Sequence, residues 1–212
     1  MWGQFRMSEE LPLFPLGMVL FPGCRVPLHI FEDRYKLMIT ECLENHTEFV
    51  LILGSDDDFK QVGCAARVTD VINQFADGRL NIIIEGTDRV RLIERRDDKA
   101  YLSGIVERIE DEVDQPAATL IDETRALYTE ALKLSIGWYR APAQENESAG
   151  LLAYTIASTL GMPVDRQQIL LEQTSITGRF RLLRELLERT LGGLREHARK
   201  IGGNGKVHRG TT

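Results

Sequence analysis

Four of the chain's seven prolines fall in one apolar stretch near the N-terminus, and this feature restricts the local fold more than any other. The stretch, residues 11–30, reads LPLFPLGMVLFPGCRVPLHI. Proline fixes φ and has no backbone N–H, so it breaks helices and is confined to edge strands and turns. We therefore predict short edge strands here, with bends at Leu16-Gly17-Met18 and Pro22-Gly23.

A helix is expected directly after this stretch, from about Phe31 to Asn45. Four apolar residues recur there at i, i+3, i+4 and i+7, which predicts one buried helix face: Tyr35, Met38, Ile39 and Cys42. The next apolar run, residues 49–53, stops at a glycine and is predicted to be a strand.

Residues 62–109 have the alternating pattern of antiparallel strands, in which every second side chain is buried. Asp77-Gly78 predicts a two-residue hairpin with a type I′ turn, because that turn needs positive φ at both central residues. A last strand is predicted over residues 101–109. Strands at this spacing, with one early helix inserted, predict a small mixed or antiparallel β-barrel.

After Glu110 the sequence becomes helical. The polar stretch 111–116 is predicted to be a linker, followed by helices over 117–138, 147–160 and 175–199. A short helix precedes the last one, where Asp165 and Gln168 have capping-box spacing. The last helix is predicted to bury one apolar stripe in a bundle rather than expose it to a partner; the stripe comprises Ile176, Phe180, Leu183, Leu187, Leu191 and Leu194.

These patterns predict an α+β chain, with a leader over residues 1–8, a barrel over 9–113, a helical bundle over 116–201 and a disordered tail over 202–212.

The N-terminal stretch resembles the opening of the Lon-protease N-terminal, or substrate-binding, domain as it occurs in stand-alone bacterial members. The shared features are a Leu-Pro-Leu-Phe-Pro-Leu start, a Phe-Pro-Gly turn, a Pro-Leu-His-Ile-Phe-Glu run and the Arg34-Tyr35 pair. The resemblance continues through VGCAARV at 62–68, DGRLNI at 77–82 and Glu85-Gly86, and extends over residues 9–200. It implies a PUA-like barrel followed by helices.

The resembling positions form a predicted structural motif. Glu32, Arg34 and Tyr35 are expected to tie the first helix to the barrel. The other members are glycines, prolines and a turn aspartate: Pro15, Gly17, Pro22, Gly23, Pro27, Gly63, Asp77, Gly78 and Gly86.

The resemblance also implies a non-enzymatic module that binds exposed apolar segments of unfolded or partly folded proteins, as an adaptor or a holdase. A separate protease or ATPase partner and self-association are left open. The predicted peptide-binding residues are Met18, Leu20, Phe21 and Val26, because an apolar edge segment can add a peptide strand or offer an apolar patch. The alternative, favoured for any single one of them, is that these side chains fill the barrel core.

No catalytic motif is present. The sequence lacks GxSxG, HExxH and GxGxxG, and it also lacks the Walker A loop and Ser-Lys dyad of full-length Lon, so neither enzymatic activity nor a cofactor is predicted. A zinc site built from Cys24, His29, Cys42 and His46 is disfavoured, because no CxxC or HxxxH pair occurs. The three widely spaced cysteines are predicted to be reduced thiols.

The net charge of -6 disfavours a broad nucleic-acid surface. The rival hypothesis is RNA or small-ligand binding by the barrel, with phosphate contacts from Arg89, Arg91, Arg95 and Arg96, although acidic residues lie among these arginines. No apolar window approaches the about 18 residues that a membrane span needs. A cytoplasmic protein is therefore expected.

Overall fold

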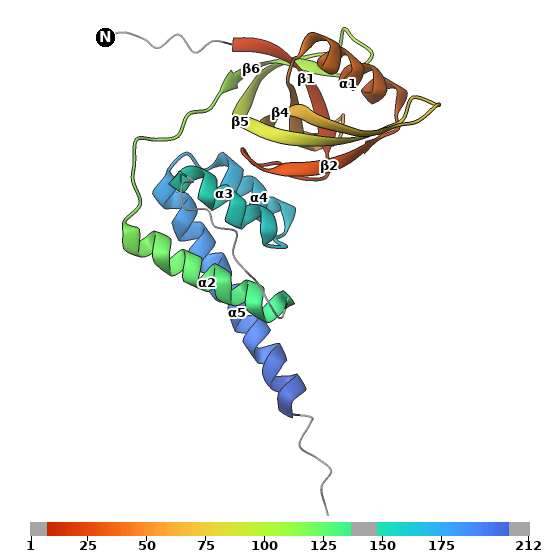
Figure 1. Cartoon of the computed structure of the whole chain (residues 1–212). Coiled ribbons are helices and arrows are strands. Elements are labelled where there is room, and N and C mark those ends of the chain that lie inside the picture. The colour runs from red at the N-terminus through yellow and green to blue at the C-terminus, as the bar shows by residue number, and fades with distance from the viewer. Residues whose placement is uncertain (1–7, 137–147, 204–212) are drawn as a thin grey trace, which may run out of the picture. The chain divides into compact units, whose positions relative to one another are not determined.

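The structure, a computed structural model, describes residues 8–136 and 148–203. The chain forms two compact units, and each unit is built from two separate stretches of sequence. The first unit comprises Met1–Glu112 and Ala157–Thr174, and the second comprises Val113–Ile156 and Ser175–Thr212. Figure 1 shows the elements of both units. The predicted leader, except for Ser8, and most of the predicted tail lie outside the described residues.

Six strands form the sheet of the first unit in the part of the chain that the structure describes: β1 (Ser8–Leu16), β2 (Arg25–Ile30), β3 (Phe49–Gly54), β4 (Phe59–Gln74), β5 (Leu80–Arg96) and β6 (Ser103–Arg108). Their order is β2-β5-β4-β3-β1-β6, and β6 also pairs with β5. β5, β4, β3, β1 and β6 therefore close into a ring, and β2 pairs with β5 beside it (Figure 1). The β1–β3 pair is parallel and the other strand pairs are antiparallel, so the predicted mixed barrel is confirmed.

The prolines of β1 and β2 lie where a missing N–H is tolerated. Residues 8–12 of β1 pair with β6, and residues 13–16 pair with β3, so the two halves of β1 pair with different strands. Pro12 and Pro15 lie in these two halves, and Pro27 lies in β2, which pairs only with β5 among the described strands. Because β1 as a whole lies between β3 and β6, the edge-strand prediction is wrong for β1, and among the described strands it is confirmed for β2.

Two buried clusters occupy opposite faces of the strands, because neighbouring strand residues point to opposite sides. The interior of the ring is filled by Leu11, Leu13, Val50, Ile52, Ala65, Val90 and Val106. The other face is covered by helix α1 (Asp33–Asn45), whose predicted stripe packs with Phe14, Leu51, Cys64 and Ile82 among others. The predicted helix and its buried residues are confirmed.

The β4–β5 hairpin turns at the predicted place but with a different geometry. The strands pair through Gln74 and Leu80, and Gly78 N donates to Phe75 O at 2.9 Å. Gly78 has a φ of +82°, whereas among the described non-glycine residues only His46 has a positive φ. The type I′ prediction is therefore wrong, and the loop is a turn followed by a left-handed glycine. The reason is the length of the loop: Phe75 N donates to Arg79 O at 2.9 Å, so three residues rather than two connect the strands, and such loops place a left-handed residue last.

Gly86 is required by a close approach of two backbone segments. Gly23 N donates to Gly86 O at 2.8 Å, and Gly86 N donates to Cys24 O at 3.0 Å, so the turn before β2 is fastened to β5. A Cβ at Gly86 would lie 2.4 Å from the Phe21 carbonyl oxygen. No side chain fits there without moving the backbone.

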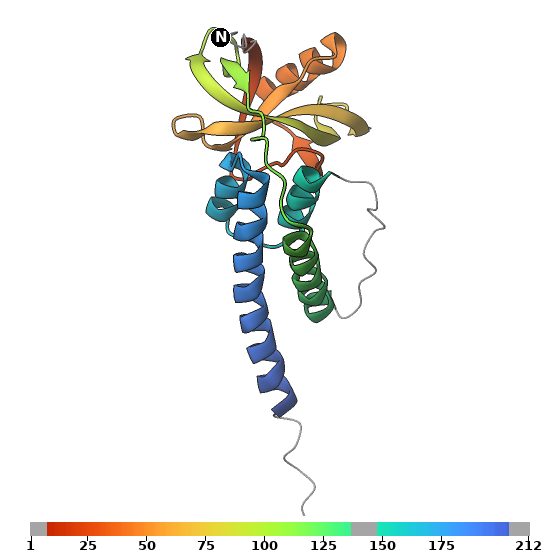
Figure 2. The same cartoon turned by 90° about the vertical axis from the view of Figure 1, so that its left-hand side faces the viewer.

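The second unit contains two long helices, α2 (Ala118–Ile136) and α5 (Ile176–Gly203), which run side by side and in parallel (Figure 2). Ion pairs join them, from Arg184 to Glu123 at 3.1 Å and from Arg195 to Glu130 at 2.7 Å. α5 buries most of its predicted stripe, namely Phe180, Leu183, Leu187 and Leu191, while Ile176 and Leu194 are half-buried. The ends predicted at Trp138 and Glu147 lie outside the described residues.

The N-terminus of α5 is capped from the predicted linker. Asp114 accepts the backbone N–H groups of Ile176 and Thr177, at 2.9 and 2.8 Å, and the Ser175 hydroxyl at 2.8 Å. Hydrogen bonds from Thr177, Ser175 and Ile176 lower the pKa of Asp114 to about 2. Ser175 in turn accepts the N–H of Gly178 at 2.9 Å, as expected of an N-cap serine.

The fourth helix, α4 (Val164–Glu172), lies with the strands, whereas the sequence assigns it to the bundle over 116–201. Its Gln168 side chain donates to the Val62 carbonyl of β4 at 3.0 Å. The N-cap is Pro163 and no side chain caps the helix, so the capping-box prediction is wrong. Gln168 is instead used to hold α4 on β4.

Helix α3 (Ala149–Thr159) connects the two units in sequence, because Ala149–Ile156 fall in the second unit and Ala157–Thr159 in the first. Within the second unit, Arg179 of α5 is fully buried, and its guanidinium lies 4.5 Å from the centre of the Tyr154 ring of α3. No sequence pattern indicated this buried arginine.

Candidate protein-binding surface

The four predicted peptide-binding residues differ in burial. Leu20 and Phe21 are each 1% exposed, so neither side chain is accessible to a partner. Their burial follows from the tight turn that fastens residues 21–24 to Gly86. The core alternative therefore holds for these two. Met18 and Val26 are half-buried against the cluster under α1, and their peptide-binding role stays a prediction.

The start of α1 is joined to the loop between β3 and β4. Arg34 pairs with Asp56 of that loop and, at 2.9 Å, with Glu32. Tyr35 donates its hydroxyl to Asp56 at 3.3 Å, and its ring centre lies 4.2 Å from that of Phe14. Burial raises the pKa of Tyr35 to about 12, so this hydroxyl keeps its proton at neutral pH.

The buried thiols have no environment that would activate them. Burial raises the pKa of both the Cys42 and the Cys64 thiol, which disfavours the nucleophilic thiolate. In the described residues, no group of three or more His, Cys, Asp or Glu side chains is placed to hold a metal ion.

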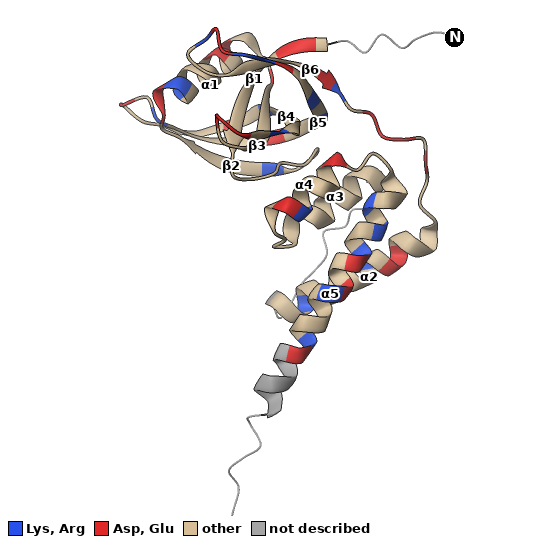
Figure 3. Cartoon of the chain, turned by 180° about the vertical axis from the view of Figure 1, so that it is seen from behind, with Lys and Arg blue, Asp and Glu red and all other residues tan. Residues whose placement is uncertain are grey.

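The arginines proposed for RNA phosphate do not form one exposed patch. Arg89 is 3% exposed and is occupied by protein acceptors. Arg95 donates to Asp97 at 2.9 Å, and Arg96 donates to Glu10 at 2.8 Å. Figure 3 shows basic and acidic positions interspersed along the strands, with acidic residues gathered on the connection that follows β6. At Arg95 and Arg96 a phosphate backbone would meet guanidinium groups that are already paired with carboxylates. Arg91 is exposed, whereas Arg89 is buried.

In contrast to these scattered arginines, exposed side chains of β2, β5 and β4 form one continuous surface on the outer face of the strands. Every second residue of β2 points to this face, and each one pairs with a residue of β5 that in turn pairs with a residue of β4. The pairing therefore arranges the side chains in three rows that run across the strands. The rows are Arg25, Glu85 and Arg67; then Pro27, Ile83 and Asp70; then His29, Asn81 and Asn73. We refer to this surface as the three-row face.

The first row places two exposed guanidinium groups on one carboxylate. Arg25 Nε donates to Glu85 at 2.8 Å, and Arg67 Nη2 donates to the other oxygen of Glu85 at 2.9 Å. The Arg25 and Arg67 side chains are 59% and 58% exposed, whereas Glu85 is 19% exposed. Hydrogen bonds from Arg25 and then Arg67 lower the pKa of Glu85, which keeps this carboxylate ionised. The pair of arginines exceeds the single carboxylate by one positive charge.

The third row continues into exposed aromatic residues, which we call the aromatic patch: His29, Phe31 and Phe75. His29 is hydrogen-bonded to Asn81 at 2.6 Å. The Phe31 ring stacks on His29 with centres 5.9 Å apart, and the Phe75 ring meets His29 edge-on at 6.3 Å. Phe31 is 60% exposed and Phe75 is 38% exposed. Grouped exposed apolar side chains mark interaction surfaces more often than isolated ones do.

Sequence reasoning missed the aromatic patch. His29 was considered only as a ligand of a disfavoured zinc site and Asp77-Gly78 as a turn, and neither Phe31 nor Phe75 was singled out. The available signal was the position of each phenylalanine: Phe31 lies between a strand and a helix, and Phe75 directly precedes a turn, where polar residues are the rule.

The comparison with protein families gives one match. The model of the ATP-dependent protease La (LON) substrate-binding domain matches residues 10–189. The chain belongs to the Lon substrate-binding domain family. The resemblance inferred from the N-terminal stretch is thereby confirmed over most of the sequence.

Lon proteases of several bacteria are among the relatives of this chain. The Lon protease of Syntrophus aciditrophicus is 25% identical over 195 residues, which cover 84% of this chain and 25% of the relative. The Lon protease 2 of Herpetosiphon aurantiacus is 28% identical over 197 residues, covering 86% of this chain and 24% of the relative. The chain thus spans about a quarter of the length of these curated relatives.

Solved structures of Lon N-terminal domains share the fold. The Lon N-terminal domain protein of Xanthomonas campestris has a TM-score of 0.66 at 25% identity, covering 82% of this chain and 96% of that one. The N-terminal domain of the Mycobacterium avium complex Lon protease has a TM-score of 0.66 at 18% identity, covering 85% of this chain and 98% of that one. The α+β fold is therefore that of Lon N-terminal domains. No helix in the described part of the chain has the length and apolar character to cross a membrane.

Proposed function

We propose that this member of the Lon substrate-binding domain family binds exposed apolar segments of unfolded or partly folded proteins and does not change them chemically. The observation that carries the proposal is the aromatic patch, because two phenylalanine side chains, 60% and 38% exposed, stand together on a folded surface. Clustered aromatic side chains are typical binding anchors. The match to a substrate-binding domain supports the same role.

In this proposal the protein acts as an adaptor that passes clients to a separate protease or ATPase, or as a holdase that keeps them soluble. Met18 and Val26 form a second, half-buried apolar group in the same unit. They offer a separate contact for a client, because Val26 alternates with Arg25 and Pro27 along β2 and faces the opposite side of the strand.

The test is binding to a permanently unfolded protein, such as reduced and carboxymethylated α-lactalbumin, measured by fluorescence anisotropy. The Phe31→Ala/Phe75→Ala variant is expected to bind at least about tenfold more weakly, because anchor residues contribute about 1 kcal/mol or more each. The matched control is Ile93→Ala, which removes a side chain that is 53% exposed elsewhere on β5. Urea unfolding of each variant verifies that the fold is retained.

Equal binding by the wild type and the double variant would overturn the proposal for the aromatic patch. If Met18→Ala/Val26→Ala alone abolished binding, the client site would lie at the half-buried group instead. Suppression of aggregation of a heated client, without added nucleotide, supports the holdase form, and its absence supports the adaptor form.

A further inference from the structure

We infer that the three-row face recognises two features of an extended client segment at once: an apolar or aromatic side chain on the aromatic patch, and an Asp or Glu side chain four residues away on Arg25 and Arg67. The inference rests on the proposed function and adds the chemistry of the client. It concerns one continuous surface of the first unit, formed by β2, β5 and β4.

The spacing follows from the register of the strands. Arg25 and His29 lie four residues apart on β2, at the two ends of the three rows. With a rise of about 3.3 Å per residue, they are about 13 Å apart. An extended peptide has the same rise, and its residues i and i+4 point to the same side. One client residue therefore reaches the arginines while the other reaches the aromatic rings.

The charges favour a carboxylate at the first row. Glu85 accepts one N–H from each arginine, and a guanidinium has five N–H donors, so donors remain on both sides of Glu85. Carboxylates are well matched to guanidinium groups because two parallel hydrogen bonds can form. A lysine at the same client position would be repelled by the excess positive charge.

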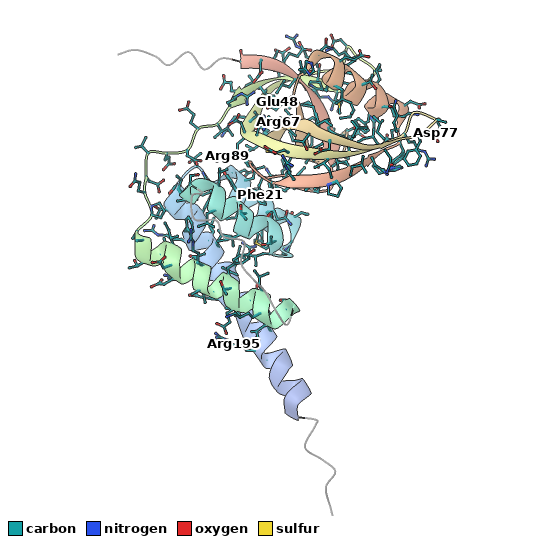
Figure 4. All side chains as sticks on the ribbon, in the orientation of Figure 1. Phe21, Glu48, Arg67, Asp77, Arg89 and Arg195 are labelled. Atoms are coloured by element: carbon teal, nitrogen blue, oxygen red, sulfur yellow. The ribbon has the colours of Figure 1, made fainter. Side chains whose placement is uncertain are left out.

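The middle row determines the path of the client. Asp70 is exposed on β4, whereas Pro27 is exposed on β2 in the same row. A client that carries a carboxylate avoids Asp70, so it lies on the β2 side. Figure 4 shows Arg67 well separated along the hairpin from Asp77, which marks the tip beside Phe75.

Side chains, rather than an added strand, hold the client. Pro27 lies in the middle of β2 and has no N–H, so a strand paired to the outer edge of β2 would meet an interruption. Recognition therefore depends on the client's side chains and their spacing. An extended peptide that lacks these two side chains is not expected to bind.

The test uses short labelled peptides with acetylated and amidated ends, in which Phe and Glu lie four positions apart in a Gly/Ser background. Replacement of this Glu by Gln is expected to weaken binding about fivefold at low salt, corresponding to about 1 kcal/mol for an exposed ion pair. Replacement by Lys is expected to weaken it further. Added salt should reduce the difference between the Glu and Gln peptides.

Charge reversal on the protein gives the complementary measurement. Arg25→Glu is expected to reverse the preference, so that the Lys peptide binds more tightly than the Glu peptide. The matched control is Arg91→Glu, an exposed arginine elsewhere on β5 that should leave the preference unchanged.

Two outcomes separate the inference from the proposed function. If Glu, Gln and Lys peptides bind equally, and binding still requires Phe31 and Phe75, the inference is refuted while the proposed function stands. If a peptide binds only when its free C-terminal carboxylate replaces the Glu side chain, the inference of side-chain recognition is also refuted. Failure of both the peptides and the unfolded client to bind refutes the proposed function itself.

Discussion

Replacement of Arg89 by alanine tests whether one buried side chain fastens α4 and the start of the linker to the barrel. Arg89 lies on β5 and is 3% exposed. Its guanidinium donates to the carbonyl oxygens of Leu171 and Gln173, at 3.2 and 2.9 Å, and to Asp111 at 2.5 Å. Because α4 ends at Glu172, Arg89 places a positive charge at the C-terminus of that helix (Figure 4).

The expected cost follows from these contacts. Removing one partner of a buried charged pair costs about 3–5 kcal/mol, because the remaining groups stay desolvated without a partner. Asp111 is 32% exposed and regains water, which favours the lower end of that range. We therefore expect a loss of about 3 kcal/mol in the free energy of unfolding. For a chain of this size the Tm should fall by about 6–12 °C.

The assay combines urea unfolding, followed by circular dichroism, with hydrogen exchange. In Arg89→Ala, the amides of α4 should exchange faster than those of α1, because the lost contacts lie at α4. Arg91→Ala, two residues along the same strand at an exposed position, is the control and should change stability by less than about 0.5 kcal/mol. A loss below about 1 kcal/mol for Arg89→Ala, or unchanged exchange in α4, would refute the fastening role.

Gly192→Ala and Gly193→Ala should each raise the stability by up to about 1 kcal/mol in urea unfolding, because glycine disfavours helices and a Cβ there meets nothing within 4 Å; no gain would contradict this. Gly86→Ala should destabilise the fold, seen as a lower Tm, since its Cβ would lie 2.4 Å from Phe21 O; an unchanged Tm would argue against the close approach. Asp114→Asn should be less stable than the wild type at neutral pH. Because the pKa of Asp114 is lowered to about 2, its contribution is present above the unfolded pKa of about 4 and is lost toward pH 2, so the two Tm values should converge there.

The sequence predicts best those features that depend on a few neighbouring residues. The helix stripe from Tyr35 to Cys42 follows from periodicity, and the edge strand around Pro27 follows from the missing proline N–H; the structure contains both. The strand around Pro15 is also present, but it lies between β3 and β6 and is not an edge strand. The hairpin at Asp77-Gly78 is also correctly located. Its turn type is not, because the hydrogen bond from Phe75 N to Arg79 O closes a loop of three residues, whereas a type I′ turn has two.

Features that depend on distant residues could not be predicted. Helix α4 has the same local pattern whether it packs on helices or on strands, and the contacts that decide come from residues 82 and 106 positions away. The aromatic patch likewise requires β2 and the β4–β5 hairpin to bring His29 beside Phe75. The burial of Leu20 and Phe21 depends on the approach of their turn to Gly86, which periodicity does not reveal.

The return of residues 157–174 to the strands has a practical consequence for protein dissection. A gene fragment that ends at Glu112 encodes all six strands but omits α4, which supplies the carbonyl acceptors of Arg89 and the amide bound to Val62. The shortest continuous fragment that contains both stretches of the first unit extends to Thr174 and carries all of α2 and α3 with it. An earlier stop codon alone therefore does not yield the first unit. To produce the first unit by itself, α4 must be joined to the strands by a designed linker.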